Sequence, residues 1–310
     1  MPPPVRPAGD PAVEAAAARL GGAARFAAPL GARTTYRLGG TAALLTVVDD
    51  EDDLAAVVAA VAASGIEVLV FGRGSNLLVA EAGFPGLCVV LGESFAGWRA
   101  DGDRVVAAGG AVAYPALARA TAEAGLAGME WAVGIPGSVG GAVRMNAGGH
   151  GSQTADRLVS ARLVDLRTGS DRTVGRDALA LSYRHSGVRP DEVVVQARFA
   201  LEAGDRDESA ARIAEIVAWR RENQPGGRNA GSVFQNPPGD SAGRLIEAAG
   251  LKDLRIGGAR VSAAHANFIE VEPGASADQV YGLICEVRRL VAERCGVELE
   301  PEICLVGFAP

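Results

Sequence analysis

Six glycines and one proline fall within the sixteen residues from Gly134 to Gly149. The proline fixes its own backbone torsion and Ser138 is a good N-cap residue, so a short helix is predicted over residues 139–145. Gly140 and Gly141 lie inside that helix, where each costs roughly 1 kcal/mol relative to alanine. A helix start with free amide groups and no side chains in the way suits a phosphate or pyrophosphate. A glycine-rich loop between two packed elements is the alternative interpretation.

A second glycine loop, Gly72-Arg73-Gly74-Ser75-Asn76, follows an apolar stretch at residues 67–71 that predicts a strand. A dinucleotide fingerprint of the Rossmann kind needs a third glycine at the sixth position and a helix after it. Leu77 holds the sixth position here, and residues 77–79 predict another short strand. The loop is therefore not a Rossmann fingerprint, although its amides can still cradle a pyrophosphate. A tight β-turn is the alternative.

These loops must be positioned by a mixture of helices and strands, which predicts an α+β fold without internal repeats. The acidic residues Asp49 to Asp53 and the later Gly65 predict the two ends of one helix. A long helix at residues 209–223 is expected to be a hinge into a final unit. The other predicted helices are 11–20, 114–124, 240–249 and 277–295, and the other strands are 43–48, 86–91, 104–108, 157–166, 192–201, 258–261, 267–271 and a closing strand.

The composition predicts a globular protein and argues against several other classes. Hydrophobic residues make up 48% and charged residues 22% of the 310 residues, which fits a globular chain of two or three domains. No apolar run reaches the roughly 18 residues of a membrane span, and the proline-rich start from Met1 to Pro11 lacks the apolar core of a signal peptide. We therefore expect a disordered lead-in, no membrane insertion and a cytoplasmic location. The net charge of −7 argues against a nucleic-acid surface, and four cysteines without Cys-x-x-Cys spacing predict neither a disulfide scaffold nor a metal site.

Seven ordered motifs between Thr34 and Gly307 resemble the UDP-N-acetylenolpyruvoylglucosamine reductase family, whose members are also called UDP-N-acetylmuramate dehydrogenases. Each motif alone is a weak signal, but seven in the right order are a strong one. The motifs are TTYRLGG (34–40), GRGSNLLV (72–79), GMEWAVGIPGSVGGAVRMNAGG (128–149), SYRHS (182–186), AGSVFQNP (230–237), AGRLIEAAGLKDLRIGGARVSAAHANFIE (242–270) and VELEPEICLVG (297–307).

The resemblance implies an FAD-binding fold of the vanillyl-alcohol-oxidase type, with two α+β subdomains around FAD and a C-terminal α+β substrate-binding domain. The domain boundaries expected from it are 1–20 for an N-terminal lead-in and helix, 21–92 and 93–204 for the FAD-binding subdomains, and 205–310 for the substrate-binding domain. The implied activity moves a hydride from NADPH to non-covalently bound FAD and then to UDP-N-acetylglucosamine enolpyruvate. The product is UDP-N-acetylmuramate, a peptidoglycan precursor.

Three residues carry the chemistry on this resemblance. Hydride delivery to the enolpyruvyl group builds negative charge on its carboxylate, and the intermediate must be stabilised and protonated. Arg184 offers a permanently charged fork for the carboxylate, Ser232 offers a hydroxyl proton, and Glu302 can stabilise the developing acid. The plain alternatives are a surface arginine, a turn or helix cap and a solvated carboxylate.

The remaining site residues are also implied by the resemblance. FAD is expected to contact both glycine loops, and the substrate is expected to contact Arg184 and its neighbours; loop-building is the alternative for Gln235 and Asn236. The expected FAD contacts are Gly72, Arg73, Gly74, Ser75, Asn76, Leu77, Gly134, Ile135, Ser138, Gly140, Gly141, Ala142 and Asn146, and the expected substrate contacts are Tyr183, Arg184, Gln235 and Asn236.

Two positions depart from the family pattern. Arg33 stands where asparagine is common, and Gln235 stands where a lysine often follows the phenylalanine. One positive charge near the substrate diphosphate is therefore missing. The chain between Arg184 and Ser232 is also short, which resembles the branch of the family without a long tyrosine-bearing substrate loop.

Two other functions compete with this one. Another FAD-dependent oxidoreductase of the same fold, such as a sugar or alcohol oxidase, is the first. Many such oxidases tether FAD through a histidine in the first subdomain, and no histidine precedes His150 here. A non-catalytic cell-wall scaffold is the second, and the presence of Arg184, Ser232 and Glu302 together argues against it. The expected partners are the UDP-sugar and NADPH, without nucleic acid, and the protein is expected to be a monomer.

Overall fold

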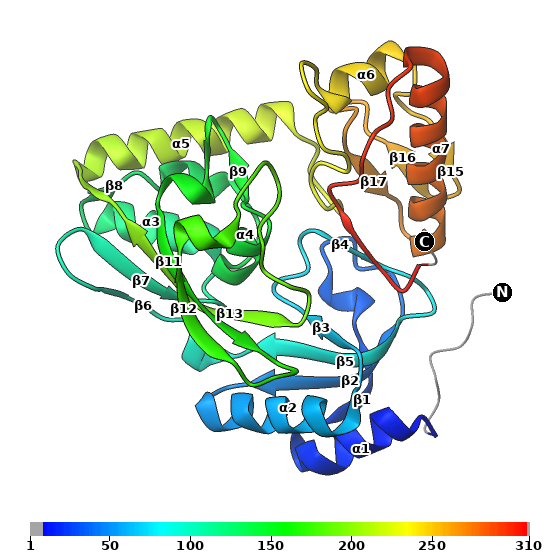
Figure 1. The fold of residues 1–310 in the computed structure, drawn as a ribbon. Helices are drawn as coiled ribbons and strands as arrows, with labels where there is room; N and C mark the ends of the chain where they lie inside the picture. Colours follow the sequence, from blue (N-terminus) through cyan, green and yellow to red (C-terminus); the bar gives the residue numbers. More distant parts are fainter. Residues whose placement is uncertain (1–8, 309–310) are drawn as a thin grey trace.

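A computed structural model describes residues 9–308, so most of the predicted lead-in lies outside the described residues. The first unit contains a four-stranded sheet in the order β1-β2-β5-β3, in which β1 is antiparallel to β2 and the other pairs are parallel. Helices α1 and α2 cover one face of this sheet (Figure 1). Its elements are α1 (Pro11–Leu20), β1 (Arg25–Pro29), β2 (Thr41–Val48), α2 (Glu51–Ser64), β3 (Val68–Val70), β4 (Leu77–Val79) and β5 (Phe84–Leu91), with 3₁₀ turns at Gly21–Ala23, Gly31–Arg33 and Glu93–Phe95.

Helix α2 shows how local sequence sets the ends of an element. The Asp50 carboxylate accepts a hydrogen bond from the Asp53 amide at 2.8 Å, and three acidic residues in the first turn complement the helix dipole. The helix stops at Gly65, whose φ of 64° is a left-handed conformation that glycine adopts without strain. Both predicted ends of this helix agree with the structure, and they orient the strand that leads into the loop at residues 72–76.

The second unit is built on a five-stranded antiparallel sheet in the order β12-β11-β13-β7-β6. Helices α3 and α4 and most of the large apolar side chains pack on one side of it. Its elements are β6 (Trp98–Ala100), β7 (Val105–Gly109), α3 (Tyr114–Glu123), β8 (Leu126–Ala127), α4 (Val139–Arg144), β9 (Gly148–Gly149), β10 (Ser152–Gln153), β11 (Leu158–Asp165), β12 (Asp171–Gly175), β13 (Glu192–Ala200) and β14 (Glu202–Ala203), with 3₁₀ turns at Glu130–Gly134, Thr154–Asp156 and Arg176–Leu179.

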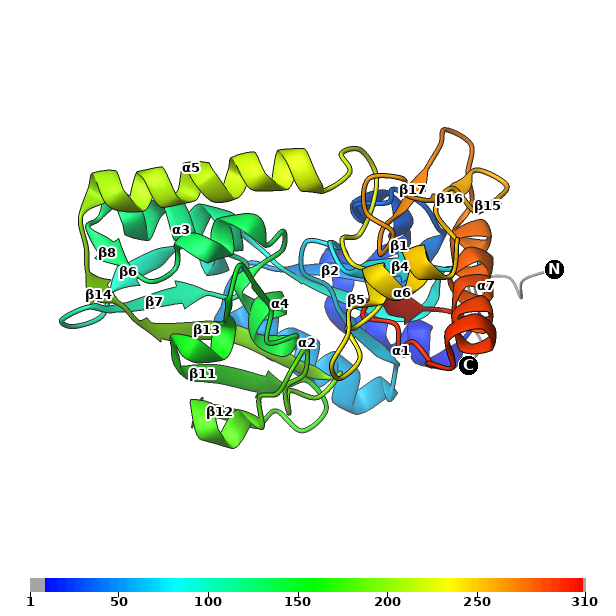
Figure 2. The same ribbon diagram turned by 90° about the horizontal axis from the view of Figure 1, so that it is seen from above.

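Helix α5 (Arg206–Asn223) lies along the second unit rather than inside the third (Figures 1 and 2). Its Ile213 and Ile216 are buried in the core of the second unit, and Ser209 Oγ donates to Glu130 Oε1 at 2.8 Å. Helix α5 therefore packs on the second unit although it lies beyond the expected boundary at residue 205. The helix leads into the third unit, but it is packed along its length on the second.

The third unit contains the sheet β15-β16-β17, covered by α6 and α7. Its last strand, β18, returns to the first unit and pairs in parallel with β4 (Figure 1). Tyr36 and Leu78 of the first unit are buried in the core of the third, so the two units share one apolar interface. The elements are α6 (Ala242–Ala248), β15 (Arg255–Ile256), β16 (Ala259–Val261), β17 (Ile269–Val271), α7 (Ala277–Cys295) and β18 (Cys304–Val306). In the described part of the chain, no helix is both long and apolar enough to cross a bilayer.

Candidate active site

The two glycine loops meet face to face although they are far apart in the chain. Ser75 Oγ donates to the Pro136 carbonyl at 2.9 Å. A Cβ atom on Gly72 would lie 2.7 Å from Ser138 Oγ, and one on Gly137 would lie 3.0 Å from Ser75 Oγ. A side chain at either glycine would press on a serine hydroxyl of the other loop, so the two loops pack closely together.

The amide groups at the start of α4 are not free. The amides of Val139 and Gly140 donate to the carbonyls of Val112 and Gly110 at 2.9 Å, and the Gly141 amide donates to Ser138 Oγ at 3.3 Å. The expectation of open amides at this helix start is therefore wrong. Tight packing explains the glycine at position 140, because a Cβ there would lie 3.2 Å from the carbonyl oxygens of Gly110 and Val194.

Open amides occur instead in the loops that precede β4 and α4. Within residues 9–308, no backbone or side-chain acceptor takes a hydrogen bond from the amides of residues 72–76 or 137–138. Gly74 is left-handed with φ of 65°, a conformation that lets successive amides converge on one point. These amides can bind a pyrophosphate, so the cradle is formed by the loops and not by the helix dipole.

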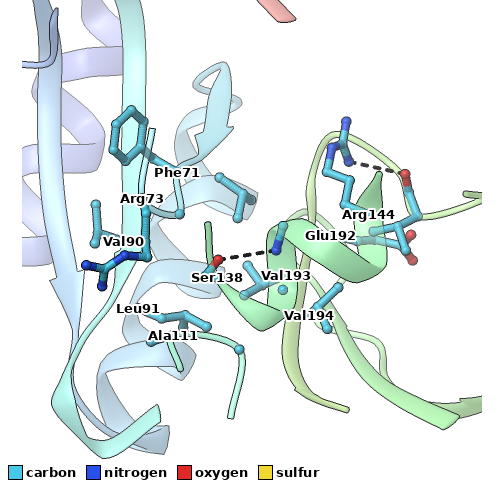
Figure 3. A pocket seen from close by; sticks show the side chains of 16 residues that line it. Phe71, Arg73, Val90, Leu91, Ala111, Ser138, Arg144, Glu192, Val193 and Val194 are labelled. Carbon is cyan, nitrogen blue, oxygen red and sulfur yellow. Dashed lines mark hydrogen bonds between the residues drawn. The ribbon is translucent and has the colours of Figure 1, made fainter. Parts of the chain in front are cut away.

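A cavity of about 210 Å³ adjoins this cradle (Figure 3). Its walls come from both units, with Val90 and Leu91 of β5 facing Val193 and Val194 of β13 across it. Five of the thirteen expected FAD contacts line it, namely Gly72, Arg73, Ser138, Gly140 and Gly141. An apolar slot beside open amides would suit a nucleotide cofactor, for which the slot offers apolar walls and the amides offer hydrogen-bond donors to phosphate.

Gly141 offers a direct test of this cradle. A Cβ atom there would meet only Ser138 Oγ, at 3.5 Å, so the protein itself leaves room for a side chain. We expect Gly141→Val to retain little or no FAD, because the branched side chain fills space that the cofactor needs, while folding changes much less. Flavin absorbance per mole of folded protein measures this.

Gly175→Val is the matched control, because a Cβ on Gly175, at the end of β12, meets nothing within 4 Å. Full FAD content in both variants would remove Gly141 from the cofactor site. If both variants lacked FAD, the cofactor would have been lost during purification, and the result would not report on the site.

Arg184 and Glu302 form an ion pair although 118 residues separate them. Arg184 Nε donates to Glu302 Oε1 at 2.8 Å, and Arg184 Nη2 donates to the Gly148 carbonyl at 2.8 Å. The side chains are only 18% and 16% exposed. Arg184 has φ of 55° in a tight turn closed by hydrogen bonds between Ser182 and His185, an unusual backbone for a non-glycine residue. Such strain is typical of residues that a functional site holds in place.

Glu302 is fixed by its backbone as well as by this ion pair. Its amide donates to the Val233 carbonyl at 2.8 Å, and its own carbonyl accepts from Asn76 Nδ2 at 2.9 Å. Burial raises the pKa of the Glu302 carboxyl above its ordinary value, and the Arg184 guanidinium opposes that rise. The Glu302 carboxyl therefore holds a proton more readily than an exposed glutamate would. Asn76 is one of the expected FAD contacts, and its side chain holds the Glu302 backbone.

Ser232 is brought beside this pair by the backbone around it. Asn267 clamps the next residues: its Oδ1 accepts from the Phe234 amide at 3.0 Å, its Nδ2 donates to the Phe234 carbonyl at 2.8 Å, and its carbonyl accepts from the Val233 amide at 2.9 Å. The segment then pairs with residues 300–303 through a bridge between Phe234 and Pro301. Ser232 is half-buried. The sequence analysis did not predict this role of Asn267. The only signal for it in the sequence is that Asn267 lies within the motif at residues 242–270.

The expected substrate contacts lie around the ion pair and Ser232. Tyr183 is 47% exposed, and its ring centroid lies 4.9 Å from Arg184 Cζ. Gln235 is half-buried, and its amide donates to the Glu300 carbonyl. Asn236 is exposed, and its Oδ1 accepts from the Ala242 amide at 3.0 Å, so it also helps to start α6.

Several other expected contacts have structural roles. Asn146 is fully buried; its Nδ2 donates to Gln153 Oε1 and to the Ser182 carbonyl, and its Oδ1 accepts from the Ala155 amide. Ala142 belongs to the core of the second unit, and the buried Gly134 carbonyl accepts from Arg220 Nη1. No direct ligand contact is proposed for these three. Leu77 begins β4 and Ile135 packs on the core, each half-buried beside its loop.

Two α+β units whose glycine loops meet beside an apolar cavity, and a third unit that contributes to the buried Arg184–Glu302 pair, are typical of an FAD-dependent oxidoreductase. Consistently, residues 42–175 match the model of an FAD binding domain, and residues 223–306 match that of the C-terminal domain of UDP-N-acetylenolpyruvoylglucosamine reductase. The chain belongs to the UDP-N-acetylenolpyruvoylglucosamine reductase family.

Named relatives cover nearly the whole chain. The UDP-N-acetylenolpyruvoylglucosamine reductase of Rubrobacter xylanophilus is 44% identical over 291 residues, 93% of this chain and 97% of that protein. The enzyme of Heliobacterium modesticaldum is 44% identical over 282 residues, 90% of this chain and 89% of that protein. The crystal structure of the reductase (MurB) from Thermus caldophilus superposes with a TM-score of 0.80 at 34% identity, covering 91% of this chain and 99% of that one. The predicted family, α+β FAD-binding fold and dependence on FAD are confirmed.

Proposed function

We propose that this protein reduces UDP-N-acetylglucosamine enolpyruvate to UDP-N-acetylmuramate with NADPH as the reductant. The observation that supports it best is the junction of the Arg184–Glu302 ion pair with the Ser232 segment, next to the nucleotide cradle. FAD, bound without a covalent link, supplies the hydride chemistry between the two substrates. The chain must then hold the enolpyruvyl carboxylate and supply one proton to carbon.

Arg184 is assigned to the substrate carboxylate. Only part of its guanidinium is free to bind that group. Its Nε already donates to Glu302 and its Nη2 to Gly148, so Nη1 and the second hydrogen on Nη2 remain for the substrate. A Cβ on Gly148 would lie 3.1 Å from Arg184 Nη1, so glycine at this position keeps the guanidinium end open. The fixed planar cation stabilises the negative charge that builds up on the carboxylate.

Ser232 is assigned as the proton donor and Glu302 as its support. No residue among 9–308 forms a hydrogen bond with Ser232 Oγ, so the hydroxyl is available to a ligand. Serine is a weak acid, and a nearby carboxyl of raised pKa can replace the proton that it gives up. We propose Tyr183, Gln235 and Asn236 as contacts to the nucleotide-sugar, and the loops at 72–77 and 135–141 as contacts to FAD.

We propose three functional units: residues 9–92, residues 93–223 and residues 224–308, with the active site where they meet. The product is a peptidoglycan precursor, so the protein serves cell-wall biogenesis and thereby cell shape and division. We place it in the cytoplasm, where NADPH and UDP-sugars are available, and as a monomer, because all three assigned catalytic groups come from one chain. Neither an oxidase nor a scaffold is favoured by the comparisons.

The test uses the purified holoprotein. Yellow colour with flavin released by heating establishes FAD, and anaerobic addition of NADPH should bleach the flavin absorbance. Addition of the enolpyruvyl UDP-sugar should then restore it, with UDP-N-acetylmuramate identified by mass spectrometry. Bleaching without recovery would refute the proposed substrate.

A further inference from the structure

A second pocket, of about 520 Å³, lies on another side of the glycine loops. Its lining brings together parts of the chain that are far apart in sequence: residues 32–37 and Arg73 of the first unit, Pro136, Arg220 at the end of α5, residues 224–229, and Phe268 of the third unit. Arg73 lines both this pocket and the apolar cavity. The pocket therefore opens beside the proposed FAD site. In the chain, the segment at residues 224–229 that lines it is soon followed by Ser232, the proposed proton donor.

Four arginines line this pocket: Arg33, Arg37, Arg73 and Arg220. None of them has a carboxylate within ion-pair distance among residues 9–308, and no acidic residue lines the pocket. This is unusual in a chain with 37 acidic and 30 basic residues, in which arginines such as Arg162 and Arg289 each contact two carboxylates. We call the four residues the arginine cluster.

Within the arginine cluster, the Arg220 guanidinium is fixed by hydrogen bonds. Its Nε donates to Gln224 Oε1 at 2.8 Å and its Nη1 donates to the Gly134 carbonyl, both neutral acceptors. Burial lowers the pKa of the guanidinium, as expected for a charge removed from water without a counter-ion. Keeping such a group is unfavourable unless an anion completes the site.

The other groups on the pocket wall also suit a phosphate. Gly226 and Gly227 present backbone without side chains, and a Cβ on either would meet nothing within 4 Å. Thr35 Oγ1 is buried without a hydrogen-bond partner among the described residues. Arginine is the residue best suited to two-point recognition of phosphate oxygens.

We propose that the arginine cluster binds the pyrophosphate group of a nucleotide substrate. This inference rests on the proposed function, in which two substrates, NADPH and the UDP-sugar, each carry a pyrophosphate. The FAD pyrophosphate has its own cradle in the open amides of residues 72–76 and 137–138, which leaves the cluster for a second one. The cluster supplies the positive charge that Gln235 does not.

The test replaces the two cluster arginines that form no side-chain hydrogen bond among the described residues and do not also line the apolar cavity, as Arg73 does. Arg33 and Arg37 are exposed and form no hydrogen bond or ion pair through their side chains within the described chain, so Arg33→Gln/Arg37→Gln should fold normally. We expect KM for one pyrophosphate-bearing substrate to rise about tenfold or more, with kcat little changed. We also expect a weaker dependence of that KM on salt, because fewer charges remain to be screened. The control is Arg19→Gln/Arg25→Gln. It makes the same change of net charge at two exposed arginines outside the pocket.

Separate half-reactions identify the source of the pyrophosphate. A rise confined to flavin reduction assigns the cluster to NADPH, and a rise confined to flavin reoxidation assigns it to the UDP-sugar. The inference is overturned if neither KM changes relative to the control, or if the double variant loses FAD, which would assign the cluster to the cofactor. A wild-type protein that is not reoxidised by the UDP-sugar would instead refute the proposed function, so the two failures are distinguishable.

Discussion

Replacing Ser232 by alanine is expected to separate the two half-reactions. NADPH should still bleach the flavin at close to the parental rate, because that step needs cofactor and nicotinamide in contact but no hydroxyl acid. Reoxidation by the enolpyruvyl substrate should slow by roughly 10²–10⁴-fold, the usual contribution of a positioned general acid. The loss grows further if the closed site admits no water to replace the hydroxyl.

The structure favours a local effect for this substitution. The backbone next to Ser232 is held by Asn267 and by the Glu302 amide, not by the serine side chain, so alanine removes a hydroxyl and leaves its surroundings in place. Stopped-flow absorbance at the flavin maximum, recorded anaerobically with each substrate in turn, measures the two rates separately.

Two other serine variants serve as controls. Ser232→Thr keeps a hydroxyl and should lose less than Ser232→Ala, and Ser170→Ala, in an exposed turn, should change neither rate. Equal slowing of both half-reactions in Ser232→Ala would indicate a structural defect. Normal reoxidation would take Ser232 out of the mechanism and leave Glu302 or water as the proton donor.

The elements that carry the site are largely predictable because their ends are encoded locally. Helix α7 begins at Ser276, which forms a capping box with Gln279, and stops at the left-handed Gly296, in agreement with the predicted helix. The strand that follows the loop at residues 72–76, β4, is also present, and a strand at that place excludes a Rossmann fingerprint. By contrast, β6 and β12 are mostly exposed edge strands, and the sequence carries no clear alternation that would predict them.

What could not be predicted depends on contacts between distant segments. The glycines of α4 correctly indicate a close approach, but the sequence does not show that the neighbours of Gly140 are the carbonyls of Gly110 and Val194 rather than a phosphate. Likewise, the sequence of α5 indicates its length but not the unit on which it packs. The hydrophobic pattern and the residue propensities indicate which helices and strands can form. Which segments then pack against one another depends on the whole fold.

The proposed catalytic cluster follows the same rule. Nothing local links Arg184 to Glu302 across 118 residues, and only the family resemblance places them together. The structure adds the reason: β18 pairs with β4, so the residues before β18 are drawn to Asn76 and hence to the cradle. The loop at residues 72–76 and the Arg184–Glu302 pair are therefore positioned by one pair of strands.

Arg184→Lys is expected to behave as a severe change despite conserving charge. An ammonium is a point charge on a flexible stem and cannot reproduce a planar group that contacts Glu302 and Gly148 while still facing the substrate. Hydrogen bonds to charged groups contribute about 1.5–3 kcal/mol each, so losing one predicts a loss of about 10- to 150-fold in reoxidation. Flavin reduction by NADPH should survive. Arg289→Lys, at an exposed ion pair on α7, is the control and should be near neutral.

A companion variant, Arg184→Gln, tests the electrostatic part of the assignment. The Arg184 charge lowers the pKa of Glu302 against the larger effect of burial, so removing that charge must raise this pKa further. The pH dependence of flavin reoxidation that reports Glu302 should therefore move to higher pH in Arg184→Gln, and less in Arg184→Lys, which keeps a positive charge. A turnover within about threefold of the parent in Arg184→Lys, less than about 1 kcal/mol, would refute the carboxylate-binding role. An unshifted pH profile in Arg184→Gln would show that the ion pair does not tune Glu302 during the reaction.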